Sequence, residues 1–195
     1  VLAPWAEPVP GQPSPLTAVE LADLPDDGWT YELVEGRLVR MPLAGTDHGG
    51  YGAALLLSLG LHVRSRKLGR VFTAETGFLL SRVGEPDTVL GADVAFVRTE
   101  RLPAQRSDQA FWRLAPDLIA EIASPNQYHP EMVAKVQIWL AAGVRLAWVA
   151  WPARQQVDVW RPGRTTPVAT LGASDTLDGL DVVPGFTLRV PEIFE

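Results

Sequence analysis

The chain has 195 residues, and 47% of them are hydrophobic, which suits one domain with a complete core. Its 17 basic and 23 acidic residues give a net charge of −6, which argues against a protein that simply coats nucleic acid. The absence of cysteine excludes disulfides, thiolate metal sites and thiol catalysis.

No apolar stretch approaches the roughly 18 residues of a transmembrane helix. The first residues lack the basic segment and apolar run of a signal peptide. We therefore expect a soluble, cytoplasmic protein with no membrane partner. Five prolines in residues 1–16 disfavour helix and strand pairing, so this segment is expected to be an extended arm or a disordered tail. Residues 17–195 are expected to form one domain.

The first elements carry clear local signals. Thr17 and Glu20 have the spacing of a capping box, which opens a short helix. The strand-like runs 29–34 and 37–41 flank Glu35-Gly36 and predict a β-hairpin.

The segment 46–68 has helical periodicity. Ala53, Ala54, Leu57 and Leu61 fall on one face, which is the predicted buried face.

The rest of the chain alternates strands and one helix. Strands are expected over 70–80, 87–97, 118–123, 144–149 and 156–160, and short strands after residue 168. A helix is expected over 132–140, with Gly143 as its C-terminal stop. This order predicts an α/β or α+β fold with a mixed sheet.

Two of these strands carry an acid where the pattern calls for an apolar residue. Asp93 lies in the run 92–97 and Glu121 in the run 118–123, and both runs are apolar on both faces, as in central strands. A buried carboxylate is costly unless it is paired, hydrogen-bonded or bound to a cation. An arginine partner or a cap would explain each acid alone. A shared metal explains two on neighbouring strands, and oxygen ligands favour Mg²⁺ or Mn²⁺.

Lys135 lies fourteen residues after Glu121 on the predicted following helix, and Lys67 is the only other lysine. One interpretation places its ammonium group beside the carboxylates. The other is a surface ion pair with Glu131, one helical turn earlier.

The order and spacing of several motifs resemble the Uma2 family of the PD-(D/E)XK nuclease superfamily. The matching pieces are Tyr31-Glu32-Leu33-Val34-Glu35-Gly36-Arg37-Leu38-Val39, His48, Ala92-Asp93-Val94-Ala95-Phe96-Val97, Glu121-Ile122-Ala123-Ser124-Pro125, Lys135, Gly143-Val144 and Trp148. The resemblance covers roughly residues 17–165. It implies a restriction endonuclease-like core, with a mixed β-sheet flanked by helices, and a Mg²⁺-dependent endonuclease that hydrolyses DNA.

The resemblance also implies residue roles. Asp93, Glu121, Lys135 and Glu32 match the catalytic positions, and Asp93, Glu121 and Glu32 would bind Mg²⁺ or Mn²⁺. Ala92 replaces the proline that the family pattern has before the aspartate. The sequence leaves open whether Glu32 or Glu35 is the additional acid.

The role of His48 is also open: its side chain contacts the substrate, or it has a packing or capping role.

Binding of DNA needs a local basic surface, because phosphate neutralisation dominates affinity. Two clusters are candidates for it or for solvated faces: Arg64, Arg66, Lys67 and Arg70, and Arg98, Arg101, Arg106 and Arg113.

The alternative function is a catalytically silent interaction module, such as a homodimer. Trp148, Trp151 and Trp160 would then form an interface. Ordinary core packing is the other explanation of these tryptophans.

Overall fold

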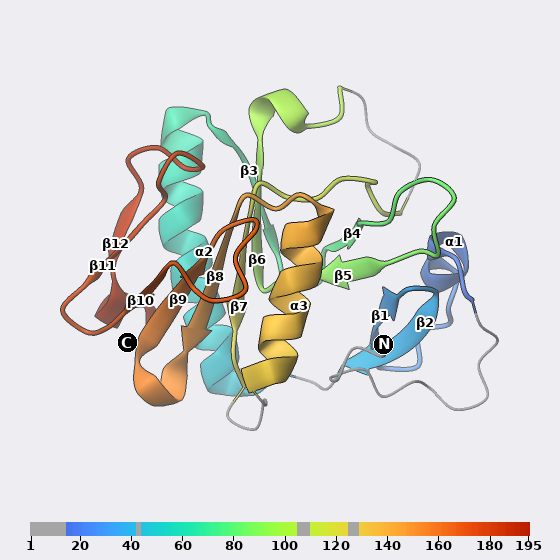
Figure 1. The fold of residues 1–195 in the computed structure, drawn as a ribbon, viewed down its shortest axis with the longest axis horizontal. Helices are drawn as coiled ribbons and strands as arrows, with labels where there is room; N and C mark the ends of the chain where they lie inside the picture. Colours follow the sequence, from blue (N-terminus) through green and yellow to red (C-terminus); the bar gives the residue numbers. More distant parts are fainter. Residues whose placement is uncertain (1–14, 42–43, 105–109, 125–128) are drawn as a thin grey trace.

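The computed structural model describes residues 15–41, 44–104, 110–124 and 129–195, so the predicted arm lies outside the described residues except for its last two. The helices and strands follow the colour order of Figure 1. The α-helices are α1 (Ala18–Ala22), α2 (Thr46–Arg66) and α3 (His129–Ala142). The strands are β1 (Thr30–Val34), β2 (Arg37–Met41), β3 (Gly69–Thr73), β4 (Gly77–Leu79), β5 (Val89–Gly91), β6 (Val94–Arg98), β7 (Leu118–Ile122), β8 (Leu146–Trp151), β9 (Gln156–Trp160), β10 (Ala169–Leu171), β11 (Thr176–Asp178) and β12 (Thr187–Arg189). In the described part of the chain, no helix has both the length and the apolar character needed to cross a membrane.

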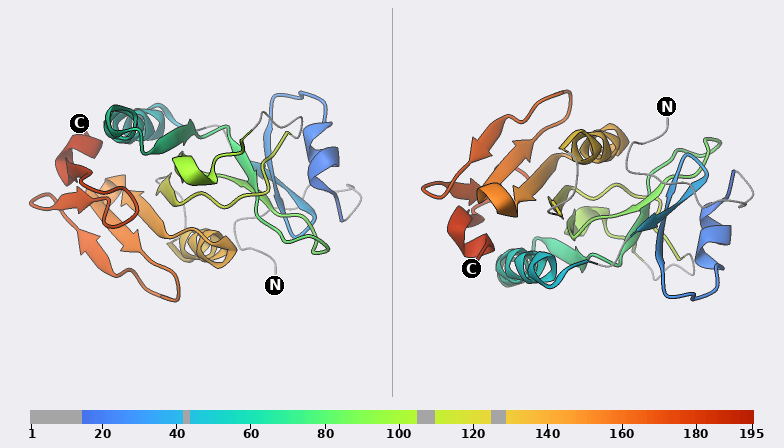
Figure 2. Two further views of the ribbon diagram at one scale, coloured as in Figure 1. Left: turned by 90° about the horizontal axis from the view of Figure 1, so that it is seen from above. Right: turned by 90° about the horizontal axis from the view of Figure 1, so that it is seen from below.

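A six-stranded sheet forms the centre of the molecule, with the order β10-β9-β8-β7-β6-β3. Strands β7 and β8 are parallel and the other neighbours are antiparallel, so the sheet is mixed, as predicted. Helices α2 and α3 cover its two faces (Figure 2). Side chains along β7 point alternately to the two faces of the sheet. Ala120 belongs to the same core cluster as Leu55 of α2, and Ile119 to the same cluster as Trp139 of α3.

A second sheet, with the order β2-β1-β5-β4, lies beside the first and packs against α1. The predicted capping box and hairpin are both confirmed. Glu35 and Gly36 have φ angles of 49° and 75°, which the tight turn between β1 and β2 requires. The hairpin register pairs Glu32 with Val39.

Two predicted long strands are each divided between the sheets. The run 87–97 forms β5 in the smaller sheet and β6 in the larger one, and the chain crosses between them at Ala92-Asp93. The run 70–80 forms β3 and β4 in the same way. The prediction was wrong because local composition shows that a segment is extended but not which partner strand it pairs with. The crossing leaves Asp93 at the junction of the two sheets.

The predicted buried face of α2 was also wrong. The residues buried against the sheet are Leu55, Leu59 and Val63, whereas Leu57 and Leu61 are 64% and 69% exposed. The helix is apolar on two opposite sides, so periodicity alone did not identify the side that meets the sheet.

The tryptophans of the C-terminal strands belong to the core. Trp148, Trp151 and Trp160 are all buried, and the Trp148 ring stacks on Phe186. Their interpretation as an interface was therefore wrong, and core packing explains them.

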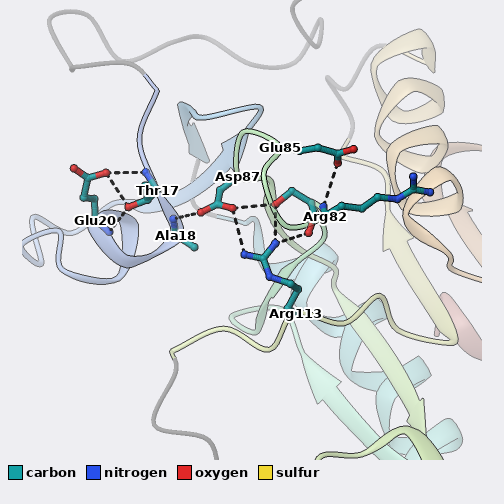
Figure 3. Close-up of polar contacts among 8 residues, drawn as sticks. Thr17, Ala18, Glu20, Arg82, Glu85, Asp87 and Arg113 are labelled. Atoms are coloured by element: carbon teal, nitrogen blue, oxygen red, sulfur yellow. Dashed lines mark hydrogen bonds and ion pairs between the residues drawn. The ribbon is translucent and has the colours of Figure 1, made fainter.

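Asp87 ties α1 to the loop that precedes β5 (Figure 3). Its Oδ2 accepts a hydrogen bond from the Ala18 amide at 2.8 Å, and its Oδ1 accepts one from the Ser81 hydroxyl at 3.0 Å. The Arg113 guanidinium lies 3.7 Å from the same Oδ1. Asp87 therefore has a structural role.

We predict that Asp87→Ala lowers the free energy of unfolding by about 1–3 kcal/mol, because two donors and an arginine lose their acceptor. Urea denaturation measures the change. Glu85→Ala is the control, since Glu85 accepts one exposed hydrogen bond from the Arg82 amide. Equal losses in the two variants would contradict this role of Asp87.

Candidate active site

Four side chains from separate elements meet where the two sheets adjoin. Glu32 comes from β1, Asp93 from the crossing between β5 and β6, Glu121 from β7 and Lys135 from α3. The structure thus brings together all four residues that the sequence singled out. They lie more than 100 positions apart at the extremes, so tertiary folding alone makes them neighbours.

The Lys135 ammonium group is the centre of this cluster. Its Nζ lies 3.0 Å from the Gly91 carbonyl oxygen, 3.2 Å from Glu121 Oε1 and 3.3 Å from Glu32 Oε1. The side chain is 6% exposed. The alternative of a surface ion pair with Glu131 is therefore wrong.

Gly91 connects Glu32 to Lys135 through its backbone. Its amide donates to Glu32 Oε1 at 2.9 Å, while its carbonyl accepts from Lys135. A Cβ atom at this position would lie 3.0 Å from the Ala74 carbonyl oxygen, so a larger residue would crowd the neighbouring backbone. The sequence carried no signal for this role, because the backbone performs it.

Glu32, not Glu35, is the acid of the site. Glu32 is 5% exposed, and its Oε2 is buried with no hydrogen-bond partner among the described residues. Glu35 is exposed in the hairpin turn. The difference follows from their positions: Glu32 lies within β1, whereas Glu35 follows the end of the strand in the turn, with a φ angle of 49°.

Glu121 is a buried carboxyl with a perturbed pKa. The pKa of its carboxyl is raised to about 7: burial is the main cause, Lys135 opposes it, and the nearby carboxylates of Asp93 and Glu32 add to it. The Trp139 indole donates to its Oε1 at 3.0 Å. For Lys135, burial works against the charged form, but Glu121 and Glu32 outweigh it and raise the pKa above its ordinary value.

Asp93 is held through one oxygen. Its Oδ2 accepts a hydrogen bond from the Ile122 amide at 2.6 Å and lies 3.3 Å from His48 Nε2. The hydrogen bond with Asp93 raises the pKa of His48, against the effect of burial. His48 lies in the first turn of α2 and contacts Asp93 from there.

The donor set of the cluster suits a hard divalent cation. Lys135 contacts the carboxylates of Glu32 and Glu121, and Asp93 lies near enough to Glu121 to raise its pKa, so negative charge is left over. Glu32 Oε2 has no hydrogen-bond partner among the described residues. Over the described ranges, no three His, Asp or Glu side chains form a group positioned to hold a metal ion. The Lys135 ammonium contacts two of the three acids, Glu32 and Glu121.

The two basic clusters are not beside these residues. Arg64 lies sixteen positions after His48 along α2, which is roughly 24 Å of helix. In the second cluster, Arg98 bonds to the Asp181 carbonyl, Arg101 pairs with Asp117, and Arg113 pairs with Asp87. Arg106 lies outside the described residues. The second cluster is therefore largely structural.

We predict that Lys135→Met lowers the free energy of unfolding by about 3–5 kcal/mol, because it leaves Glu32 and Glu121 buried without their counter-ion. Adding Glu32→Gln should recover part of the loss, since one of the two charges is then absent. Chemical denaturation in EDTA of wild type, Lys135→Met, Glu32→Gln and the double variant gives the double-mutant cycle. Strictly additive losses would contradict the ion-pair geometry.

The raised pKa of Glu121 predicts that the stability of the fold depends on pH. Its raised pKa means that the native state keeps a proton that the unfolded chain releases near pH 4.5, so this carboxyl destabilises the fold increasingly as pH rises from 4.5 to about 7. The difference in unfolding free energy between Glu121→Gln and wild type should therefore shift in favour of the variant across that window. Denaturation at several pH values in EDTA measures it, and a constant difference would contradict the burial of the charge.

Comparison with known proteins identifies relatives of this fold. The model of the Uma2 family, described as "Putative restriction endonuclease", matches residues 18–191. A solved structure described as a putative nuclease belonging to DUF820 from Anabaena variabilis ATCC 29413 is similar, with a TM-score of 0.76. The two are 20% identical, and the match covers 92% of this chain and 98% of the other. No curated protein matches the chain.

Proposed function

The chain belongs to the Uma2 family, whose model covers most of its length, and on this premise we propose that it is a metal-dependent endonuclease that hydrolyses DNA phosphodiester bonds. The family and the nuclease-like fold support a nuclease. DNA as substrate and the metal dependence are our proposals.

One observation carries the proposal: a buried lysine contacts two carboxylates beside a third, at the junction of two sheets. A purely structural ion pair needs one acid for one lysine. Here Glu32, Asp93 and Glu121 together exceed the charge of Lys135, and the carboxyl of Glu121 has its pKa near neutrality. Perturbed groups that gather in this way are typical of catalytic sites.

Asp93 and Glu121 would hold Mg²⁺ or Mn²⁺, with Glu32 contributing Oε2 directly or through water. A metal ion bound there would lower the pKa of the attacking water and stabilise the negative charge on the phosphate. The Ile122 amide and His48 keep Asp93 oriented by holding Oδ2. Trp139 and Lys135 do the same for Glu121 through Oε1.

Lys135 would act on the attacking water or on the phosphate. Its ammonium group would orient the attacking water or offset the negative charge that develops on the phosphate. Gly91 and Glu32 fix the ammonium in place, so little reorganisation is needed during the reaction.

The proposal predicts that plasmid DNA is cleaved in Mg²⁺ or Mn²⁺, and that Asp93→Asn and Lys135→Gln each lower the rate by about 100-fold or more. Glu32→Gln should be impaired, whereas Glu35→Gln, which removes an exposed acid of the same hairpin, should be as active as wild type. Circular dichroism confirms that the variants are folded.

Calorimetric titration with Mn²⁺ separates the proposed nuclease from a silent module of the same fold. Wild type should bind the metal and Glu121→Gln should not. Equal residual cleavage in wild type, Asp93→Asn and Lys135→Gln, together with no metal binding, would establish the silent module instead.

A further inference from the structure

An exposed histidine stacks on a buried tryptophan near the candidate active site. The rings of His129, the first residue of α3, and Trp151, the last residue of β8, have centroids 4.9 Å apart and planes inclined by 13°. Trp151 is 8% exposed, whereas His129 is exposed. One face of the imidazole therefore covers the indole, and its outer face is directed to solvent.

The indole beneath the histidine is fixed in place. Its Nε1 donates a hydrogen bond to Asp158 Oδ2 at 2.8 Å, and the Thr170 hydroxyl donates to the other oxygen of the same carboxylate. Asp158 is buried on β9, which pairs with β8. A fixed indole holds the imidazole above it in a defined orientation, so the stack is a preformed flat surface.

The stack lies at the same edge of the sheet as the carboxylates. Strands β7 and β8 are parallel, and their register pairs Glu121 with Val149, two residues before Trp151. Residues two apart on a strand point to the same face, so the side chains of Glu121 and Trp151 both lie on the face that α3 covers. Figure 1 shows the first turn of α3 at this edge. His129 and Lys135 are six residues apart on α3, which is about 9 Å along the helix axis.

A cation without a counter-ion borders the stack. Arg154 belongs to the 3₁₀ turn Pro152–Arg154 that follows β8, and its guanidinium carbon lies 5.6 Å from the centroid of the Trp151 ring. It is exposed and forms no ion pair with any residue that the structure describes. Arg101 and Arg113, by contrast, pair with acids. The charge of Arg154 is therefore available to an anionic ligand at this edge.

We propose that the outer face of His129 is a stacking platform for an unpaired base of the DNA strand held at the site, and that Arg154 contacts a phosphate of that strand. This inference rests on the proposed function. Aromatic rings that stack on bases, beside cations that contact the backbone, are how proteins hold single strands. At the 3.4 Å rise of a stacked strand, the distance of about 9 Å to Lys135 corresponds to about three nucleotides.

The platform has a consequence for the class of substrate. A base within a duplex has both of its faces covered by neighbouring bases, so it reaches a side chain only when it leaves the stack. We therefore expect the site to select DNA that is single-stranded or unpaired a few nucleotides from the cleaved bond.

Binding of single strands in Ca²⁺ tests the platform. The two probes are a thymidine oligonucleotide of about 12 nucleotides and an abasic strand of the same length, which has the same phosphates and no bases. Wild type should prefer the thymidine strand by about 10-fold, the scale of one base stacked on an aromatic side chain. His129→Ala should lose most of this preference, and His129→Phe should keep it, because phenylalanine offers a similar flat face.

His62→Ala is the matched control. His62 also packs against an aromatic ring, that of Phe186, but it lies fourteen residues after His48, about 21 Å farther along α2. Its loss should leave the preference for bases as in wild type. Shielding of the indole from water is the other explanation of the stack. In that case His129→Ala would be less stable in urea and would keep the preference, which would overturn the proposal.

Arg154 has its own test. Arg154→Ala should weaken the binding of both strands alike and lower the slope of log affinity against log salt by about 0.7, the value for one phosphate of a single strand. Arg64→Ala removes an exposed cation at the far end of α2 and should leave the slope unchanged. An unchanged slope in Arg154→Ala would overturn the phosphate contact.

The outcomes separate this inference from the proposed function. If wild type cleaves DNA and His129→Ala has the same preference for bases as wild type, the platform is overturned and the nuclease stands. If wild type binds neither strand and cleaves no DNA, both are overturned.

Discussion

The burial of one ammonium group determines how this site is built. Lys135 cannot lie in the protein interior without counter-charges and acceptors, and Glu32, Glu121 and the Gly91 carbonyl provide them. These partners come from β1, β7 and β5, so the lysine on α3 joins both sheets. The cluster thus adds an electrostatic link between the two sheets to the apolar core that they share.

The cluster is not electrically balanced, and this separates it from a structural ion pair. Asp93 adds a third carboxylate within the influence of Glu121, whose pKa burial raises to about 7. Such a carboxyl is poised between its two protonation states, and a bound cation would favour the ionised form. The negative net charge of the chain is therefore compatible with a nuclease, since part of it lies where a metal would be held.

Two of the three candidate acids were predictable because each breaks a local rule. A carboxylate in an apolar strand conflicts with the hydrophobic pattern, so Asp93 and Glu121 were visible in the sequence. Glu32 was identified only through the family resemblance, which also favoured a site role for Lys135 over a surface ion pair. Gly91 acts through its backbone, and the side of α2 that meets the sheet depends on tertiary packing, so neither was predictable. The division of the run 87–97 between two sheets has the same cause, since strand pairing is not local.

The most direct test of this account is a crystal structure of the protein soaked in Mn²⁺, with the ion located by anomalous scattering. We expect one Mn²⁺ bound by Asp93 and Glu121, with the Lys135 ammonium still in contact with Glu32. A structure in which Mn²⁺ does not bind, with Lys135 holding Glu32 and Glu121 as it does without metal, would show that the cluster is a structural ion network.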